Sequence, residues 1–365
     1  MVTQVDILFS FGGSTTRVLI GTGLLSDGSA FSEIGVRSRA FVLSDSNVWE
    51  RCGPAVGKSL IDAGWRVESM VIPPGELSKT LERVAEVYEK LARFSLGRDG
   101  LIVAVGGGVV TDLAGFIAAT WMRGVTSAYV PTTLEADIDA CIGGKTGVNW
   151  NATKNLIGVF HHPRLVVVDA RCLSTVSDRD LSAGMAESIK HALLAGEDDF
   201  AWHEANADAV LARDDETLVR LIDRNLRIKA GFVARDPFEQ LGHRDALNLG
   251  HTIGHGIEAA CGFNLRHGEC VALGLVAACW ISERMGLLPG ETVERVVALL
   301  ARFRLPIRLP STVDESEIMN HLRRDKKFRD GNMRFVLLES PGRHVVRSDV
   351  AETMVRDAIA SLQPG

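Results

Sequence analysis

The sequence lacks the patterns that mark several common classes of protein. Its six cysteines include no Cys-x-x-Cys pair, and no window approaches the ~20 apolar residues that a membrane-spanning helix requires. The first residues contain no basic stretch followed by an apolar one, so we expect no secretory signal. A net charge of −6 provides no basic field for nucleic acid. These absences predict a cytoplasmic protein with reduced cysteines and without nucleic-acid or membrane partners.

Length and local patterning indicate two domains. The chain has 365 residues, of which 46% are hydrophobic and 24% charged, and this length exceeds what one small core requires. Residues 1–176 alternate short β-rich runs with helical patterns, which predicts a doubly wound α/β domain built from parallel βαβ units. Residues 177–365 contain mostly helical periodicity, which predicts a mostly α-helical second domain.

A glycine run follows one predicted strand of the first domain. Residues 101–105 are an apolar run typical of a buried strand, and Gly106–Gly108 follows directly before a predicted helix that contains Thr111 and Asp112. Glycines at such a point let the backbone approach a pyrophosphate at a helix N-terminus. Thr111 stands where the dinucleotide fingerprint requires its third glycine, so the run is equally compatible with a tight strand-to-helix turn.

A long loop is predicted after the strand at residues 127–130. It continues to Asn155 and includes Lys145 and Lys154 together with several glycines. Lysines are common in solvated loops, but a solvated loop seldom embeds them in a segment as apolar as residues 142–148. The combination of glycines and lysines therefore indicates anion binding.

The region 244–267 concentrates ionisable side chains. His251 and His255 are one helical turn apart and Glu258 nearly two, so the three share one helix face. His267 returns a third imidazole after the helical pattern ends, which is a common way to complete a divalent-metal site. A helical histidine pair without such company is more often solvated or structural.

Arg244 and Asn248 extend the polar stripe toward the N-terminus of the same helix, which we predict over residues 245–260. Ile253 and Ile257 offer an apolar side for burial. A polar stripe on a helix with so few exposed-type residues predicts that these side chains line a buried polar cleft.

Two other predicted helices, over residues 178–195 and 215–235, carry charged candidates. Glu187 and Lys190 lie at i, i+3, and Glu187 is a candidate carboxylate ligand for a metal otherwise held by histidines. Without a partner, this pair is as well explained by a surface ion pair. Lys229 lies well inside a helix that ends before Asp236, and a solvated lysine is the alternative there.

Together these motifs resemble the dehydroquinate synthase family, the sugar phosphate cyclases, over nearly the whole chain. The matching segments are GGGVVTDLAGFIAATWMRG (106–124), PTTL (131–134), DIDACIGGKTGVN (137–149), KNLIG (154–158), DLSAGMAESIKH (180–191), RDALNLGHTIGHGIE (244–258), RHGE (266–269) and DKK (325–327). Several long motifs in the family's order make the resemblance specific. It implies an NAD domain, a helical metal domain and an active site in the cleft between them, generally in a homodimer.

The resemblance also implies three sets of site residues. The ligands of one divalent metal, zinc or cobalt, are Glu187, His251 and His267. The NAD site comprises Asp45, Asn47, Glu76, Lys79, Gly107, Gly108, Asp112, Thr132, Thr133, Asp139, Lys145 and Lys154. The catalytic and substrate-binding residues are Arg123, Lys145, Asn155, Lys190, Lys229, Arg244, Asn248, His255 and Lys326.

The implied reaction is cyclisation of the sugar phosphate 3-deoxy-D-arabino-heptulosonate 7-phosphate to 3-dehydroquinate, with elimination of phosphate and transient oxidation by NAD. His255 is the implied proton shuttle and Arg244 the implied carboxylate-binding group. Two alternatives stay open. One is a cyclase for another sugar phosphate, such as sedoheptulose 7-phosphate or an amino analogue of the usual substrate. The other is a metal-dependent NAD alcohol dehydrogenase of similar architecture.

The chain departs from the family's usual pattern near the predicted long loop. Glu135 and Asp137 stand where leucine- and glutamine-like residues are usual, and Trp150 follows the GKTGVN run. We expect these changes to alter the fine shape of the site around the cofactor. They do not touch the three metal ligands.

Overall fold

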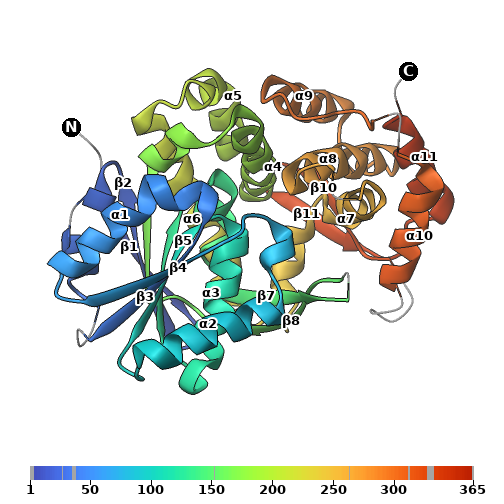
Figure 1. The fold of residues 1–365 in the computed structure, drawn as a ribbon. Coiled ribbons are helices and arrows are strands. Elements are labelled where there is room, and N and C mark those ends of the chain that lie inside the picture. Colours follow the sequence, from blue (N-terminus) through green and yellow to red (C-terminus); the bar gives the residue numbers. More distant parts are fainter. Residues whose placement is uncertain are drawn as a thin grey trace. The chain divides into compact units, whose positions relative to one another are not determined.

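The computed structural model describes residues 4–26, 28–34, 38–151, 153–262, 264–310, 313–326 and 333–363. The chain divides into two compact units, one made of Met1–Val176 with Arg213–Phe238 and the other of Ser177–Ala212 with Glu239–Gly365 (Figure 1). The sequence predicts a single boundary after residue 176, and a boundary lies there. Arg213–Phe238 nevertheless groups with the first unit, because α6 (Asp215–Arg235) packs against β1 (Val5–Phe11) and β2 (Ser14–Gly21).

A seven-stranded sheet forms the centre of the first unit. Its order is β1-β2-β9-β6-β5-β3-β4, in which the β1–β2 pair is antiparallel and the other pairs are parallel. The remaining strands are β3 (Arg39–Asp45), β4 (Arg66–Ile72), β5 (Leu101–Gly106), β6 (Thr126–Pro131) and β9 (Leu165–Asp169). Every residue of β5 and β9 is buried, as expected for central strands covered on both faces. The predicted α/β class is confirmed.

The strand order reverses beside β3. The chain passes from β3 to the edge strand β4 and then returns to the other side of β3 to form β5. In open α/β sheets, ligands bind outside the carboxyl ends of the two strands at such a switch point. The ends of β3 and β5 therefore define where this unit is built to hold a ligand.

The helices of the first unit are α1 (Ser46–Asp62), α2 (Leu81–Phe94), α3 (Gly108–Thr120) and α6. In α2 the Thr80 hydroxyl accepts the Arg83 N–H at 3.3 Å and caps the first turn. Val84, Val87 and Leu91 are buried at helical spacing, so one side of α2 faces the core. Packing of such apolar sides on the sheet stabilises this unit.

An antiparallel hairpin of β7 (Lys145–Trp150) and β8 (Thr153–Phe160) replaces part of the predicted long loop. Gly147 pairs with Gly158, and a Cβ on Gly147 would lie 2.6 Å from the Ile157 carbonyl oxygen. Most of β8 is exposed, so its sequence lacks the alternation of a half-buried strand. The prediction of irregular structure is wrong for these two segments.

The second unit is mostly helical, as predicted. Its α-helices are α4 (Asp178–Ala195), α5 (Glu197–Leu211), α7 (His251–Ala260), α8 (His267–Arg284), α9 (Gly290–Arg302), α10 (Glu315–Lys326) and α11 (Glu352–Ser361). The largely buried α8 packs against α4, α7 and a hairpin of β10 (Phe335–Ser340) and β11 (Arg343–Arg347). Helix α8 is thus the centre of this unit.

The helix predicted over residues 245–260 is interrupted in the structure. A short 3₁₀ helix, η7 (His243–Asn248), ends before Gly250, and α7 begins at His251. Gly250 has φ +78°, a left-handed conformation that cannot continue a right-handed helix. Arg244 and Asn248 therefore do not share a helix with His251, which corrects the prediction of one continuous polar stripe.

Two expectations from composition can be compared with the structure. All six cysteines are free and buried, as predicted. Among the residues that the structure describes, no helix combines the length and the apolar character needed to cross a membrane.

Candidate metal centre and nucleotide site

Glu187 lies in the middle of α4, which begins after the Ser177 cap and is buried along most of its length. The Glu187 side chain is 2% exposed, and its Oε2 pairs with the ammonium of Lys190, which is 3% exposed. A buried carboxylate requires such charge compensation, and the i, i+3 spacing puts Lys190 on the same face. The alternative of a surface ion pair is therefore wrong for these two residues.

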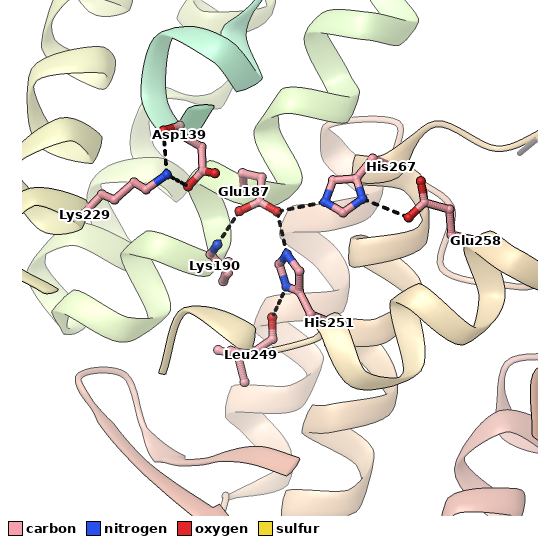
Figure 2. Close-up of polar contacts among 8 residues, drawn as sticks. All are labelled: Asp139, Glu187, Lys190, Lys229, Leu249, His251, Glu258 and His267. Atoms are coloured by element: carbon pink, nitrogen blue, oxygen red, sulfur yellow. Dashed lines mark hydrogen bonds and ion pairs between the residues drawn. The ribbon is translucent and has the colours of Figure 1, made fainter. Parts of the chain in front are cut away.

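The other carboxylate oxygen of Glu187 faces two imidazoles. Oε1 lies 3.2 Å from His251 Nε2 and 3.6 Å from His267 Nε2 (Figure 2). It is buried and accepts no well-aligned hydrogen bond from the described residues. Tetrahedral zinc bonds of ~2.0–2.1 Å would place neighbouring ligand atoms ~3.3–3.4 Å apart. The two distances from Oε1 are close to this value, as expected for a carboxylate oxygen that shares an ion with each imidazole.

A hydrogen-bond acceptor lies beside Nδ1 of each imidazole ring, on the side opposite Nε2. His251 Nδ1 lies 3.1 Å from the Leu249 carbonyl oxygen, and His267 Nδ1 lies 3.2 Å from Glu258 Oε2 (Figure 2). Such an acceptor places the proton on Nδ1 and leaves the Nε2 lone pair available. A nitrogen lone pair and a carboxylate oxygen repel each other. Two lone pairs that point at the same oxygen are therefore stable only when a cation lies among the three atoms. The donor set of Glu187, His251 and His267 thus fits a divalent metal.

Close helix packing brings these three side chains together. A Cβ on Gly268, next to His267, would lie 1.9 Å from the Ala183 carbonyl oxygen of α4. Further along α8, a Cβ on Gly274 would lie 1.8 Å from the carbonyl oxygen of Gly250, just before α7. Glycine permits backbones to approach this closely, so these positions set the spacing of α4, α7 and α8.

The electrostatic environment keeps Glu187 ionised. Burial raises the pKa of Glu187, but the ammonium of Lys190, together with His251 when that imidazole is protonated, outweighs burial. The resulting pKa lies well below the ordinary value of a glutamate. An ionised carboxylate is the form that binds a metal.

His255 lies one turn after His251 on α7 and is exposed. Its ring centroid is 5.2 Å from that of His251 and 5.9 Å from that of His267, and one ring nitrogen from each of the three lies within 4.8 Å of the others. The dense surrounding protein and then the two imidazoles lower the pKa of His255 to about 3, although part of the ring reaches solvent. The three imidazoles are a second conceivable donor set. The first set includes the anionic oxygen of Glu187, 3.2 and 3.6 Å from two of these rings, which makes Glu187, His251 and His267 the candidate ligands.

In the first unit, several predicted NAD residues lie at the switch point of the sheet. Asp45 ends β3, and its Oδ1 accepts the N–H groups of Asn47 at 2.8 Å and Val48 at 3.2 Å. Gly107 caps α3 and Gly108 is its first residue. The N-terminus of α3 is thus open at the edge where such sheets bind anionic ligands.

Lys79 connects three segments that are distant in sequence. Its ammonium lies 2.5 Å from Asp112 Oδ2 and also donates to Asn155 Oδ1. Burial raises the pKa of Asp112, and Lys79 opposes this rise without cancelling it. Asn149 donates to Glu76 Oε1 at 2.8 Å and accepts the Asn155 N–H at 2.9 Å. Asn149 received no role from the sequence, although it lies within a matched motif.

Lys229 of α6 pairs with Asp139 in the short π-helix η5 (Ala136–Ala140). Its Nζ lies 2.8 Å from Asp139 Oδ1 and 2.5 Å from the Asp139 carbonyl oxygen (Figure 2). Lys229 is 6% exposed, so the alternative of a solvated lysine is wrong. The resemblance assigns Asp139 to NAD and Lys229 to substrate, whereas the structure joins them directly.

The loop after β6 holds two predicted NAD residues. Thr132 is buried, and the Thr133 hydroxyl accepts the Ala136 N–H at 3.3 Å. On the β7–β8 hairpin, Lys145 is exposed and Lys154 is half-buried.

Four predicted substrate residues lie on three separate elements of the two units. Arg123 is exposed, has φ +68° and follows α3 at the end opposite Gly108, roughly 20 Å away at 1.5 Å per residue. Arg244 is buried and Asn248 is half-buried on η7. Lys326 is the last residue of α10, and its side chain lies outside the described residues.

The departures from the family pattern occupy different environments. Asp137 is completely buried, Glu135 is half-buried and Trp150 is 43% exposed at the end of β7. The buried Asp137 is therefore the departure with the largest energetic consequence.

Two family models match the chain in succession. Residues 69–183 match the 3-dehydroquinate synthase N-terminal family, and residues 184–328 match the 3-dehydroquinate synthase C-terminal family. A 3-dehydroquinate synthase from Symbiobacterium thermophilum is 42% identical over 95% of this chain and 97% of its own length. One from Saccharophagus degradans is 40% identical over 96% of this chain and 95% of its own length.

Solved structures of two other enzymes share the fold. A 2-deoxy-scyllo-inosose synthase complexed with carbaglucose-6-phosphate, NAD⁺ and Co²⁺ has a TM-score of 0.90 at 27% identity, covering 98% of this chain and 100% of its own. A 2-epi-5-epi-valiolone synthase from Streptomyces hygroscopicus subsp. jinggangensis 5008, with NAD⁺ and Zn²⁺ bound, has a TM-score of 0.88 at 25% identity, covering 97% and 98%.

Proposed function

Because the chain belongs to the 3-dehydroquinate synthase family, we propose that it converts 3-deoxy-D-arabino-heptulosonate 7-phosphate to 3-dehydroquinate with elimination of phosphate. The similarity to proteins of that name over nearly their full length supports this activity. The structural observation that carries the proposal is the meeting of Glu187 Oε1 with the Nε2 atoms of His251 and His267. A cyclase of this kind requires a metal beside its redox cofactor.

The proposed cofactors are NAD and one divalent ion, zinc or cobalt. Related structures contain NAD⁺ with Co²⁺ or with Zn²⁺. In this chain the two imidazoles and the carboxylate suit either ion, and the ends of β3 and β5 suit a dinucleotide. When bound, NAD supplies a reversible hydride acceptor, and the metal supplies a Lewis acid that polarises a substrate hydroxyl.

The chain's own side chains bind the substrate and move its protons in this proposal. Arg244 offers a planar guanidinium for a carboxylate. His255 is exposed and next to the proposed metal ligands, which supports a role in exchanging a proton with the substrate. The groups proposed to hold the phosphate and the remaining hydroxyls by charge-assisted hydrogen bonds are Arg123, Lys145, Asn155, Lys190, Lys229, Asn248 and Lys326.

Two other activities are compatible with the same fold. Solved relatives include cyclases for other sugar phosphates, which would share the metal and NAD groups. An NAD alcohol dehydrogenase would also use them, but it would release NADH in proportion to its product. The higher identity to 3-dehydroquinate synthases favours the first proposal.

The test is to incubate the protein with NAD, zinc and each member of a panel of sugar phosphates. We expect phosphate release from the heptulosonate without accumulation of NADH, and a product with the mass and NMR spectrum of 3-dehydroquinate. Efficient turnover of sedoheptulose 7-phosphate alone would favour another cyclase. NADH equal to product would favour a dehydrogenase.

Metal content tests the ligand assignment independently of turnover. Protein purified without chelator should contain about one equivalent of divalent metal, as expected for a single site. His267→Ala should lose it. Full occupancy in this variant would remove His267 from the site.

We also propose a homodimer located in the cytoplasm. The family resemblance supports the dimer, and six free, buried cysteines are typical of a reducing compartment. Sedimentation equilibrium at several protein concentrations should give twice the chain mass, whereas a monomer at all of them would contradict the proposal.

A further inference from the structure

Glu258 orients one of the proposed metal ligands. We propose that it is a positioning residue, which holds the His267 ring through Nδ1 so that Nε2 faces the metal. This inference rests on the proposed metal centre and deepens it. Glu258 lies on α7, whereas His267 begins α8, so the contact joins two helices.

The two histidine ligands are held in different ways. His251 Nδ1 is held by the backbone carbonyl of Leu249, two residues earlier. His267 Nδ1 faces a side chain, the Glu258 carboxylate, at 3.2 Å. A backbone acceptor cannot be removed by substitution, whereas the Glu258 acceptor can. The contact between Glu258 and His267 is therefore the part of the centre that a single substitution can test.

The burial of Glu258 argues that this contact is more than a surface pairing. The Glu258 side chain is 9% exposed and that of His267 is 28% exposed. A carboxylate removed from water requires hydrogen bonds, and the Nδ1–H of His267 supplies one. In return, the carboxylate fixes the ring tautomer and increases the basicity of Nε2, which faces Glu187 Oε1.

Other contacts fix the backbone around His267 but do not orient its imidazole ring. Arg179 of α4 makes a bidentate pair with Glu269 at 2.6 and 2.7 Å, and Arg266 pairs with Asp180 at 2.8 Å. These ion pairs tie the start of α8 to the helix that carries Glu187. They do not touch the imidazole. Glu258 therefore controls the ring within a backbone that is held independently.

The experiment measures metal affinity of the purified protein by competition with a chromophoric chelator, using zinc and cobalt. Glu258→Met should weaken binding by roughly 10–100-fold, the usual effect of removing such a partner of a ligand. Glu258→Gln keeps an amide oxygen that can accept the Nδ1–H, and we expect a loss of only a few-fold. The Co²⁺ absorption spectrum should change in Glu258→Met and remain similar in Glu258→Gln.

The matched control is Glu204→Met, which removes a partly buried carboxylate of the same unit that pairs with Arg295. It should leave metal affinity unchanged. If Glu258→Met does not fold, Glu258→Asp withdraws the carboxylate by one methylene and should also weaken binding. Wild-type affinity in the folded Glu258→Met or Glu258→Asp variant would overturn the inference. If the wild-type protein binds no metal, or His267→Ala binds it normally, the proposed centre fails instead.

Discussion

Asp137 should destabilise the protein increasingly as pH rises above the acid range. Its side chain is 0% exposed, and neither carboxylate oxygen accepts a hydrogen bond from the described residues. Burial raises the pKa of Asp137 well above the usual value of an aspartate, and the negative charge of Asp169 adds to the rise. The carboxyl group is therefore protonated in the folded protein under conditions where an unfolded chain ionises it.

The sign of the effect follows from proton linkage. Below about pH 3.9, the usual aspartate value, Asp137 is protonated in both states and contributes no pH dependence. Between that pH and the raised folded pKa, the folded state binds more protons, so stability falls as pH rises. Each pH unit in this window costs about 1.4 kcal/mol, and the loss becomes constant above the folded pKa.

Asp137→Asn removes the titration while keeping nearly the same shape. We expect little change in stability near pH 4 and a gain at neutral pH of about 1.4 kcal/mol for each pH unit of this window that lies below neutrality. The melting temperature at neutral pH should therefore be higher in Asp137→Asn than in the wild type. Calorimetric melting at a series of pH values measures both quantities.

The matched control is Glu135→Gln, which removes a half-buried carboxylate from the same segment. It should shift the melting temperature by a similar small amount at every pH. A constant difference between Asp137→Asn and wild type from pH 4 to 8 would refute the reasoning. So would a gain that is largest at acid pH.

Two further substitutions test the metal unit and the substrate site. Gly268→Ala forces a Cβ to within 1.9 Å of the Ala183 carbonyl oxygen, so we expect ~1–3 kcal/mol lower stability and at least tenfold weaker metal binding, measured by melting and chelator competition. Gly231→Ala, where an added Cβ meets no atom within 4 Å, should instead gain up to ~1 kcal/mol. Arg244→Met should lower kcat/KM for the heptulosonate by roughly thirtyfold or more, since leaving one buried charge unpaired costs ~2–5 kcal/mol. Arg334→Met removes the ion pair with Asp245, the residue after Arg244, and should change kcat/KM only a few-fold. Equal losses of kcat/KM in the Arg244→Met and Arg334→Met variants would contradict a carboxylate-binding role for Arg244.

Local signals were sufficient to predict the bounds of several elements. The sequence predicts a helix over residues 178–195, and α4 spans Asp178–Ala195. Ser177 caps its first turn through Asp180, and Gly196 with φ +147° ends it. Where capping residues and apolar periodicity coincide, the sequence alone defines the helix.

Elements with weak periodicity escaped prediction. The edge strand β1 contains Leu8, which is 67% exposed and interrupts the alternation of apolar and polar residues. The hairpin of β7 and β8 depends on the pairing of Gly147 with Gly158, whose effect is visible only in three dimensions. The break at Gly250 also has no local signal stronger than the helical pattern around it. In these cases tertiary packing decided the backbone.

The candidate metal centre was predictable because carboxylate and imidazole groups are distinctive ligands, and because His267 follows shortly after the histidines of α7 in the sequence. The acids that pair with Lys79 and Lys229 were not predictable in this way. Lys79 pairs with Asp112, 33 residues later, and Lys229 pairs with Asp139 across 90 residues. No sequence period or motif relates positions so far apart. The resemblance assigns both acids to the NAD site and not to an ion pair with a lysine.

These pairings change how the lysines can act. Lys79, Lys190 and Lys229 each contact an acid, so none presents an uncompensated positive charge. An ammonium group has three donors, and an acid that takes one or two of them holds the side chain in place for a ligand that takes another. An anionic substrate would therefore meet lysines that are already oriented, with less rotamer entropy left to lose on binding. The same acids oppose anion binding by repulsion, so specificity would depend on the positions of the remaining donors more than on net charge.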